Sequence, residues 1–514
     1  MTFFPDQAKW LKKAEALKPA LLHETVVPTR LVRPVADASA FQGWRVEADE
    51  RDLASLDSTA LGDGEVVILD FGEHRVGRLS LRIESDRSFN DAPVRLKLIF
   101  AEVPAELAEP FDPFTGYLSR NWLQDEQLTI DELPVTITIP RRFAFRYVRI
   151  ETVGIPSAFR IHLRDIACET TASVPQAIDH MIPSGLSEGD RAIAAASIRT
   201  LRDCMQTVFE DGPKRDRRLW IGDLRLQALT NSVSYRNFDL VKRCLYLFAG
   251  VARDDGLVPA CLYETPNPHN AQCYAMDYPA LYSVTLADYV AHTGDETTGQ
   301  ELLPVAIRQL ELLLGYRRAN GTYQEKDLWW FIDWHDKLDR QPCIQGLMLY
   351  CIRTVVALAN RLEMSSSTEK LANLIPELTQ AARAQFVAGK PLPATTSGQV
   401  SWGAWAWLSK GQVLSPEEAT SAFDRMQLLP ETVKPGGPYL MHYCLEALMD
   451  IGRNQTAMEL LRRYWNEMLD AGFDTFPEVW DVANPRRSPY GNHLLNSHCH
   501  AWSCTPVWFF AQPT

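Results

Sequence analysis

The sequence predicts a multidomain β + α protein, with an N-terminal antiparallel β-sandwich followed by an (α/α)6 barrel. Apolar and polar residues alternate with a period of two from about residue 26 to residue 170, and apolar residues then recur with a helical period to the end of the chain. A chain of 514 residues is also too long for one ordinary hydrophobic core. We expect a helical segment over residues 1–24, the sandwich over 25–175 and the barrel over 176–514.

The first expected elements are one helix and a set of short strands. An amphipathic pattern predicts a helix from Asp6 to Leu17, ended by Pro19, that packs on a neighbouring element. Runs of alternating or β-branched residues then predict strands over 66–72, 77–83, 94–100, 128–130, 135–139 and 145–150. Gly, Pro, Asp and Asn separate these runs, and short strands at this density indicate an antiparallel sandwich.

Helical periodicity begins after Ser173-Val174-Pro175 and predicts about twelve helices. The expected helices cover 192–210, 224–237, 238–254, 278–292, 299–318, 344–362, 369–386, 398–410, 416–426, 440–453, 456–470 and 497–510. Gly212-Pro213 ends the first of them, and Ser415-Pro416-Glu417-Glu418 is a capping box that begins another. Because no short fixed repeat joins the helices, they favour a closed ring of hairpins over a solenoid.

Composition argues against several classes of function. The net charge of −13 does not suit a nucleic-acid or anionic-membrane partner. The longest apolar runs are far shorter than the ~20 residues that span a membrane, and the first residues do not have the pattern of a signal peptide. The ten cysteines have neither CxxC nor zinc-finger spacing, which is typical of reduced thiols. We therefore expect a cytoplasmic protein without a metal or another cofactor.

The thirteen residues from Asp211 to Asp223 are the most unusual stretch of the chain. They contain three carboxylates, four basic groups and Trp220, and they lie between two helical patterns. A solvated charged turn is the ordinary explanation of such a stretch, and Asp223 stands where a helix N-cap belongs. The mixed charges around one aromatic ring instead favour a binding loop at the mouth between two helices.

Three further stretches, residues 263–278, 328–336 and 476–502, also combine carboxylates with aromatic rings. In a barrel of helical hairpins such loops gather at one end of a central funnel, so we expect them to share a site. Their candidate site residues are Asp277, Asp333, Trp334, Glu478, Trp480, His500 and Trp502.

Carboxylates beside tryptophans, without a metal set or a phosphate loop, are typical of carbohydrate chemistry. Hydrolysis of a glycosidic bond needs one protonated carboxyl group to protonate the leaving oxygen, and a second, ionised carboxylate to activate water or to attack the anomeric carbon. Tryptophan rings cover the apolar face of a sugar, while Asp, Arg and His bind its hydroxyl groups. The four stretches supply all of these groups.

Three alternative readings of these residues stay open. Asp333, His335 and Asp336 offer metal ligands, although their spacing matches no strong motif. Cys499 beside His498 or His500 offers a nucleophile and a base, although neighbours at a helix start point apart. A hydrogen-bonded core histidine is the ordinary explanation of His500.

One motif resembles a known family. The run Asp211-x-Pro-x-Arg215-x-Arg217…Trp220-x-Gly222-Asp223 is similar to the active-site signature of the bacterial α-L-rhamnosidases of glycoside hydrolase family 78. The stretches 333–334, 475–480 and 497–502 agree with that family in order and rough spacing, and Phe71-Gly72 and Arg142-Phe143 resemble its β-sandwich. The resemblance covers nearly the whole chain.

The resemblance implies roles for individual residues. Asp216 takes the position of the general acid, and Glu478 takes that of the general base. Family members invert the anomeric configuration, so the two carboxyl groups are expected to lie ~6.5–9.5 Å apart. The residues expected to hold rhamnose hydroxyls or to shape the sugar pocket are Asp211, Arg215, Trp220, Asp223, Trp334, Trp480 and His500, to which Asp277, Asp333 and Trp502 are added as candidates.

The acid position departs from the family pattern, because the family usually has Glu where this chain has Asp216. Asp216 is one methylene shorter, so the loop approaches closer, a water relays the proton, or Asp211 or Asp223 donates it. Arg217 and Arg218 would lower the pKa of Asp216 unless they point away.

The family resemblance also implies a substrate class. A short chain without added binding modules favours small rhamnosylated substrates, such as disaccharides and flavonoid glycosides. The alternatives are a hydrolase of another deoxy sugar or of an unsaturated uronide (with Arg215, Arg486 or Arg487 as the clamp), a lyase, and a sugar-binding protein without turnover. A homodimer is consistent with the general prevalence of symmetric dimers.

Overall fold

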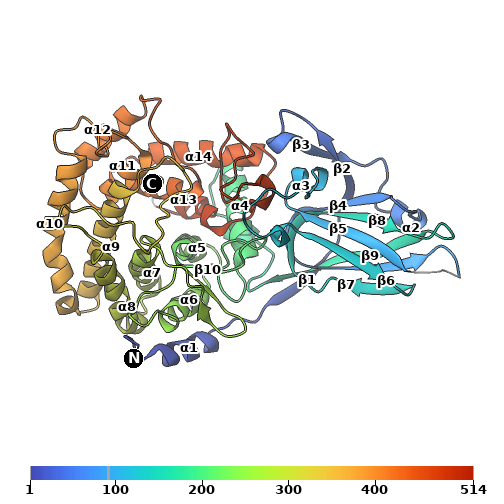
Figure 1. Ribbon diagram of the computed structural model, residues 1–514, viewed down its shortest axis with the longest axis horizontal. Helices are drawn as coiled ribbons and strands as arrows, with labels where there is room; N and C mark the ends of the chain where they lie inside the picture. Colours follow the sequence, from blue (N-terminus) through green and yellow to red (C-terminus); the bar gives the residue numbers. More distant parts are fainter. Residues whose placement is uncertain (1, 89–92, 513–514) are drawn as a thin grey trace.

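The computed structural model describes residues 2–88 and 93–512. An N-terminal antiparallel sheet region is followed by a helix-rich remainder, and the two lie side by side along the longest axis of the molecule (Figure 1). The switch from period two to helical periodicity therefore marks a real structural boundary.

The sheet region pairs all of its strands antiparallel. Its strands are β1 (Leu22–Val26), β2 (Arg30–Ala36), β3 (Trp44–Ala48), β4 (Val66–Ser85), β5 (Val94–Ala101), β6 (Asp125–Ile130), β7 (Val135–Thr138), β8 (Phe143–Gly154) and β9 (Ile161–Ala172). The main order is β1-β9-β4-β8-β5-β6, while β2 pairs with β3 and β4, and β7 pairs with β4. Along β5, Val94, Leu96 and Leu98 are buried and Arg95 is exposed. One face of this strand therefore lies in a core, as the alternation of apolar and polar residues predicted.

The structure confirms the expected strands and corrects their number. The runs 66–72 and 77–83 are one long strand, β4, whose register with β8 shifts between Asp70 and Arg75. Gly72, in the left-handed conformation at φ 84°, lies at this irregularity and made the strand look like two. Strands β1, β2, β3 and β9 were not among the expected runs.

The helix-rich remainder contains α4 (Glu188–Cys204), α5 (Ile221–Val233), α6 (Phe238–Gly250), α7 (Tyr278–Thr293), α8 (Glu296–Leu314), α9 (Gln341–Arg361), α10 (Glu369–Phe386), α11 (Trp402–Lys410), α12 (Pro416–Met426), α13 (Pro438–Asp450), α14 (Asn454–Asp470) and α15 (Pro506–Phe510). Helices α5, α7, α9, α11 and α13 contact one another in this order. The short 3-10 helix η6 (Ala501–Ser503) contacts both α13 and α5, which closes the chain of contacts. The capping box at Ser415 is present at the start of α12.

Two helix predictions were wrong at the segments that later prove functional. Helix α4 ends at Cys204, not at Glu210, and the expected helix over 497–510 is extended at His500 and helical only in η6 and α15. Tertiary hydrogen bonds replace the helical ones: His500 N donates to Phe476 O at 2.8 Å, and Ala501 N donates to Asp211 O at 2.8 Å. These partners are distant in the sequence, so a local pattern did not reveal them.

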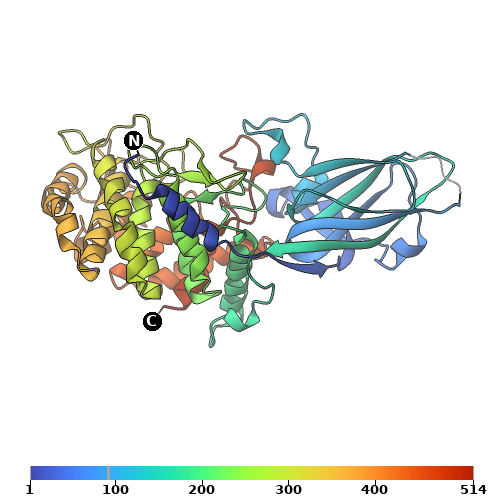
Figure 2. The same cartoon turned by 90° about the horizontal axis from the view of Figure 1, so that it is seen from below.

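The first helix, α1 (Gln7–Ala16), packs on the helix-rich remainder although the chain then enters the sheet region. Figure 2 shows α1 lying across the helices, and its contacts are with α6. Trp10 is 3% exposed, and Gln7 Nε2 donates to Ala252 O at 2.7 Å. The expectation that this helix packs on a neighbour is confirmed.

Helix α9 explains the most apolar stretch of the chain. Among the described residues it is the one helix long and apolar enough to cross a membrane by length and composition, with a mean hydropathy of 1.5. Within the protein, 72% of its apolar window is buried, and it contacts α7, α8, α10 and α11. Core packing therefore accounts for its composition.

Removing the Trp10 ring is expected to detach α1. Because Trp10 is buried, Trp10→Ala leaves a cavity that costs about 3–5 kcal/mol. Thermal unfolding of this variant should begin at a lower temperature than that of Lys12→Ala, which changes an exposed residue of the same helix. Equal unfolding temperatures for the two variants would contradict the packing of α1.

Candidate active site

A cavity of about 220 Å³ lies where the unusual loops of the helix-rich remainder meet a loop of the sheet region. Nine of the residues singled out in the sequence line it: Asp211, Arg215, Asp216, Trp220, Asp223, Trp334, Glu478, His500 and Trp502. The residues that line it without having been expected are Leu118, Trp122, Arg218, Tyr278, Trp329, Phe331 and Tyr490. The separate stretches therefore form one site.

The buried Arg215 guanidinium links the two carboxylates that were expected to act as acid and base. Its Nη1 lies 3.2 Å from Asp216 Oδ1, and its Nη2 donates to Glu478 Oε2. Its Nε donates to Leu495 O at 3.2 Å, and its plane lies 4.0 Å from the centre of the Tyr490 ring. Arg215 thus fixes the relative positions of the two carboxylates.

Glu478 is 2% exposed and is held on three sides. The Tyr490 hydroxyl donates to Glu478 Oε1, and Arg215 donates to its other carboxylate oxygen. Trp502 Nε1 donates to the Glu478 backbone carbonyl at 3.0 Å. Both carboxylate oxygens therefore accept hydrogen bonds although the group lies out of water.

Asp211 organises the loop that carries Asp216. Asp211 Oδ1 accepts from Arg218 N at 3.0 Å, and Asp211 Oδ2 accepts from Asp216 N at 3.2 Å. Burial, followed by the nearby Asp216 charge, raises the pKa of Asp211 well above its usual range. The Asp211 side chain is therefore occupied with the backbone of its own loop.

Asp223 lies in the first turn of α5 and does not cap it. The helix begins at Ile221, and no side-chain cap bond is formed at Trp220, so the N-cap explanation of Asp223 was wrong. Burial, together with the charges of Asp211 and Glu478, raises the pKa of Asp223 well above its usual range. Asp223 instead presents a carboxyl group to the cavity.

The two arginines that follow Asp216 lie in different places. Arg218 Nη1 is 3.9 Å from Asp216 Oδ2, and its guanidinium lies 4.6 Å from the centre of the Tyr263 ring. Burial, assisted by the charge of Arg142, lowers the pKa of Arg217 to about 9. Arg217 makes no ion pair with Asp216 in the described part of the chain, so of these two arginines Arg218 is the one that approaches Asp216.

Several buried polar atoms of the cavity have no hydrogen-bond partner among the described residues. They are Trp220 Nε1, Trp334 Nε1, Asp223 Oδ1 and His500 Nδ1. An unsatisfied buried donor or acceptor costs about 1–3 kcal/mol, so such atoms together in one cavity indicate a polar ligand.

His500 is not a satisfied core histidine. Its ring nitrogens lie 3.9 Å from Asp211 Oδ2 and 3.8 Å from Asp223 Oδ1, beyond hydrogen-bond reach. Burial and the Arg215 charge lower the pKa of His500 well below its usual range, so the ring is neutral. A neutral imidazole offers one donor and one acceptor, which suits a hydroxyl group.

The structure places Asp277, Asp333 and Trp480 away from the cavity lining. Asp277 accepts from Ile332 N at 2.6 Å, and Asp333 accepts from Gly436 N at 2.5 Å. Trp480 stacks on Phe41 of the sheet region, with ring centres 5.7 Å apart. The two carboxylates hold loops in place, and Trp480 packs between the two regions, so direct contact of these residues with a substrate stays a prediction.

The proposed metal and nucleophile alternatives do not match the geometry. Asp333 is bound to the Gly436 amide, and His335 Nδ1 accepts from Lys337 N at 3.3 Å. The buried Cys499 thiol lies 3.8 Å from Thr200 O and does not line the cavity. Of the three arginines offered as a uronide clamp, Arg486 pairs with Glu109 and Arg487 donates to Trp334 O, whereas Arg215 lines the cavity.

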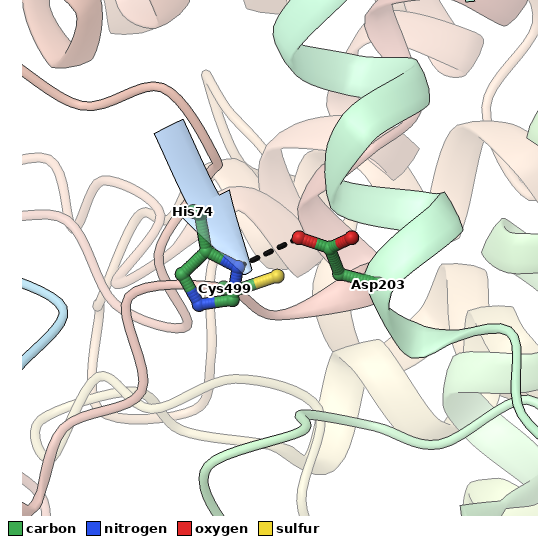
Figure 3. A group of neighbouring side chains, drawn as sticks. All are labelled: His74, Asp203 and Cys499. Atoms are coloured by element: carbon green, nitrogen blue, oxygen red, sulfur yellow. Dashed lines mark hydrogen bonds and ion pairs between the residues drawn. The ribbon is translucent and has the colours of Figure 1, made fainter. Parts of the chain in front are cut away.

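One group of potential metal ligands, His74, Asp203 and Cys499, is found among the described residues (Figure 3). His74 Nδ1 lies 2.7 Å from Asp203 Oδ2, and its Nε2 lies 3.1 Å from Glu102 Oε1. Burial opposes the charged ring, but Cys499 and the two carboxylates raise the pKa of His74 well above its usual range. His74 forms a buried ion pair with the two carboxylates and joins the sheet region to the helices.

The sheet region also anchors the loop that carries Asp216. Lys214 Nζ lies 2.5 Å from Glu106 Oε1 and 2.9 Å from both Leu494 O and Asn496 O. Glu106 belongs to the short helix α3 (Pro104–Ala108), which precedes β6. One buried lysine thus joins the sheet region to two loops of the site.

The His74 ion pair should make stability depend on pH. Since the folded pKa of His74 is raised above its unfolded value of ~6.5, its contribution is fully present below about pH 6.5 and is lost as pH rises through the folded pKa. His74→Gln should therefore lower the unfolding temperature more at pH 6 than at high pH. An equal loss at every pH would show that folding does not shift the pKa of His74, and His162→Gln serves as the control.

Two family models match this chain. Residues 28–170 match the glycosyl hydrolase family 78 alpha-rhamnosidase N-terminal domain, and residues 191–513 match the bacterial alpha-L-rhamnosidase 6 hairpin glycosidase domain. No curated protein gives a significant match. A solved rhamnosidase from Klebsiella oxytoca with rhamnose bound is 39% identical, with a TM-score of 0.93 and 98% of each chain covered.

More distant solved structures share the fold. A family 78 rhamnosidase of Bacillus sp. GL1 is 21% identical with a TM-score of 0.73, over 88% of this chain and 47% of that one. The Streptomyces avermitilis α-L-rhamnosidase complexed with L-rhamnose is 17% identical with a TM-score of 0.68, over 96% and 44%. With two family models matching most of its length, this chain belongs to the α-L-rhamnosidases of glycoside hydrolase family 78.

Proposed function

We propose that the enzyme releases terminal α-L-rhamnose from small rhamnosides with inversion, using Asp216 as the general acid and Glu478 as the general base. The observation that carries this proposal is the single Arg215 guanidinium that contacts both carboxylates at the wall of a cavity with unpartnered polar atoms. The rhamnose-bound Klebsiella oxytoca structure supports rhamnose as the sugar.

In the proposed reaction, Asp216 gives its proton to the glycosidic oxygen as the bond to the anomeric carbon breaks. Glu478 takes a proton from a water molecule, whose oxygen attacks the anomeric carbon from the opposite face. The products are β-L-rhamnose and the free alcohol or phenol. Asp216 ends ionised and Glu478 ends protonated, and a proton exchange with solvent restores both.

Asp216 suits the acid role better than Asp211 or Asp223. Asp211 accepts hydrogen bonds from two backbone amides of its own loop, so its carboxyl group is committed to that loop. Asp223 is 2% exposed and lies beside His500, among the most enclosed groups of the cavity. The Asp216 side chain is 16% exposed, as expected for a group that meets a leaving group near the mouth.

The unpartnered atoms provide the sugar-binding groups of this proposal. Trp220 Nε1 and Trp334 Nε1 can donate to sugar hydroxyls, while Asp223 and neutral His500 can exchange hydrogen bonds with them. The ring of Trp502 lies against His500, with centres 4.1 Å apart, and supplies an apolar surface for the sugar ring. A cavity of about 220 Å³ suits one monosaccharide unit and part of a leaving group.

We also propose that the helix-rich remainder is an (α/α)6 barrel and that the sheet region is a β-sandwich, with limits near 25–175 and 176–514. The closed chain of contacts through α5, α7, α9, α11, α13 and η6 supports the barrel. A separate apolar core, which contains Val67, Leu81, Leu98 and Phe143, supports the sandwich. A cytoplasmic location and a homodimer stay predictions from the sequence.

The acid and base roles can be separated by leaving-group chemistry. Asp216→Asn should lower kcat/KM by about 10²–10⁴-fold on an alkyl rhamnoside but much less on a dinitrophenyl rhamnoside, whose leaving group needs no proton. Glu478→Gln should lower both rates, because water activation is needed for either substrate. NMR of the first product formed should show β-L-rhamnose.

Asp254→Asn, which changes an exposed carboxylate outside the cavity, is the matched control and should keep parental rates. Turnover of the alkyl rhamnoside by Asp216→Asn at parental rate would move the acid role to another carboxyl group. α-L-Rhamnose as the first product would contradict inversion.

A further inference from the structure

We propose that a loop of the sheet region, residues 109–124, builds the leaving-group subsite and selects flat apolar leaving groups through Leu118 and Trp122. This inference rests on the proposed function, because it takes the Asp216 end of the cavity as the place of bond cleavage. Leu118 and Trp122 line the same cavity as Asp216 and Glu478, although they lie about one hundred residues before the acid loop.

The side chains that line the cavity differ in their exposure to solvent. Asp211, Asp223, Glu478 and His500 are each at most 4% exposed. Leu118 and Trp122 are half-buried, and Trp329 is 39% exposed. An enzyme that removes a terminal sugar places the sugar in the closed end, so the leaving group lies at the mouth. Besides Asp216 and Arg218, whose side chains are 16% and 25% exposed, the groups at that mouth are apolar and aromatic.

The loop is fixed against the helical part, so its two apolar side chains have defined positions. The Tyr117 hydroxyl donates to Pro489 O, and Tyr117 N donates to Tyr490 O at 3.2 Å. Gly116 lies so close to Leu495 that a Cβ atom there would be 2.6 Å from Leu495 Cδ1. At the base of the loop, Arg120 binds both Asp112 and Asp125.

The contacts that anchor this loop also connect the leaving-group end of the cavity to Glu478, the proposed base. Tyr490, whose backbone carbonyl receives the Tyr117 amide, donates its hydroxyl to Glu478. Leu118 and Trp122 also pack on the apolar core of the helix-rich part. The loop is thus built into the site, and its exposed aromatic surface is available to a planar leaving group. Offset stacking and apolar contact recognise an aryl ring, whereas a sugar leaving group would call for hydrogen-bonding groups at this mouth.

The test compares binding at the two ends of the cavity. For Trp122→Ala, we expect the KM for a nitrophenyl α-L-rhamnoside to rise about three- to tenfold with little change in kcat, since stacking binds ground state and transition state alike. The inhibition constant of free L-rhamnose, which fills only the sugar end, should stay unchanged. The KM for a rhamnosyl-glucose disaccharide should change less than that for the aryl substrate.

Matched variants keep this test decisive. Trp122→Phe should recover most of the aryl KM, and Leu118→Ala should reproduce a smaller part of the effect. Leu128→Ala is the control, because Leu128 is equally half-buried in the same region but packs on the sheet core. Thermal unfolding identifies any variant that fails to fold.

Each outcome has one meaning. Unchanged aryl KM in Trp122→Ala and Leu118→Ala would overturn the subsite. If the inhibition constant of L-rhamnose rose as much as the aryl KM, Trp122 would lie at the sugar end and the proposed subsite would be overturned. An equal rise in the KM for the disaccharide would also overturn it. Loss of turnover in Glu478→Gln, together with the expected rise in aryl KM in Trp122→Ala, would support both proposals. Parental turnover in Glu478→Gln would overturn the proposed mechanism alone.

Discussion

Two adjacent buried cations, Lys214 and Arg215, hold the site together. Lys214 binds Glu106 of the sheet region and two backbone carbonyls of the 494–496 segment. Arg215 binds Asp216, Glu478 and the Leu495 carbonyl. A buried charge is tolerated only when it is paired and hydrogen-bonded, and removal of one partner costs about 3–5 kcal/mol. The pairing requirement therefore brings the Asp216 loop, the Glu478 segment and the sheet region into one arrangement.

This arrangement explains the electrostatics of the cavity. Glu478 lies out of water, yet Arg215 and Tyr490 donate to its two oxygens. Asp211 and Asp223 lack such charged partners, so burial raises their pKa values. Carboxyl groups in one small space thus differ in character because their hydrogen-bond donors differ. The unpartnered polar atoms beside them are stabilised only when a polar ligand supplies their hydrogen bonds.

The sheet region is part of the functional unit. It supplies Glu106 to Lys214, Glu102 and His74 to a buried ion pair, and Leu118 and Trp122 to the cavity. Trp480, which follows the base by two residues, stacks on Phe41 of the same region. These contacts explain why the match to the family covers both parts of the chain and why the 39% identical relative has the same two-part extent.

The sequence alone determined the two-part architecture and the centre of the site. The change of apolar period is a local property, so strands β4 to β8, most helices and the capping box at Ser415 were predictable, whereas β1, β2, β3 and β9 were not. The 211–223 motif brings Asp211, Arg215, Asp216, Trp220 and Asp223 together within thirteen residues, so its chemistry could be predicted from the sequence. Only the tertiary structure decided the rest. His500 is extended, and its amide donates to the distant Phe476 carbonyl. Asp277 and Asp333 accept hydrogen bonds from backbone amides, and Trp480 packs on Phe41. Leu118, Trp122 and Tyr490 reach the cavity through contacts between segments far apart in the chain, and no periodicity or spacing encodes such contacts.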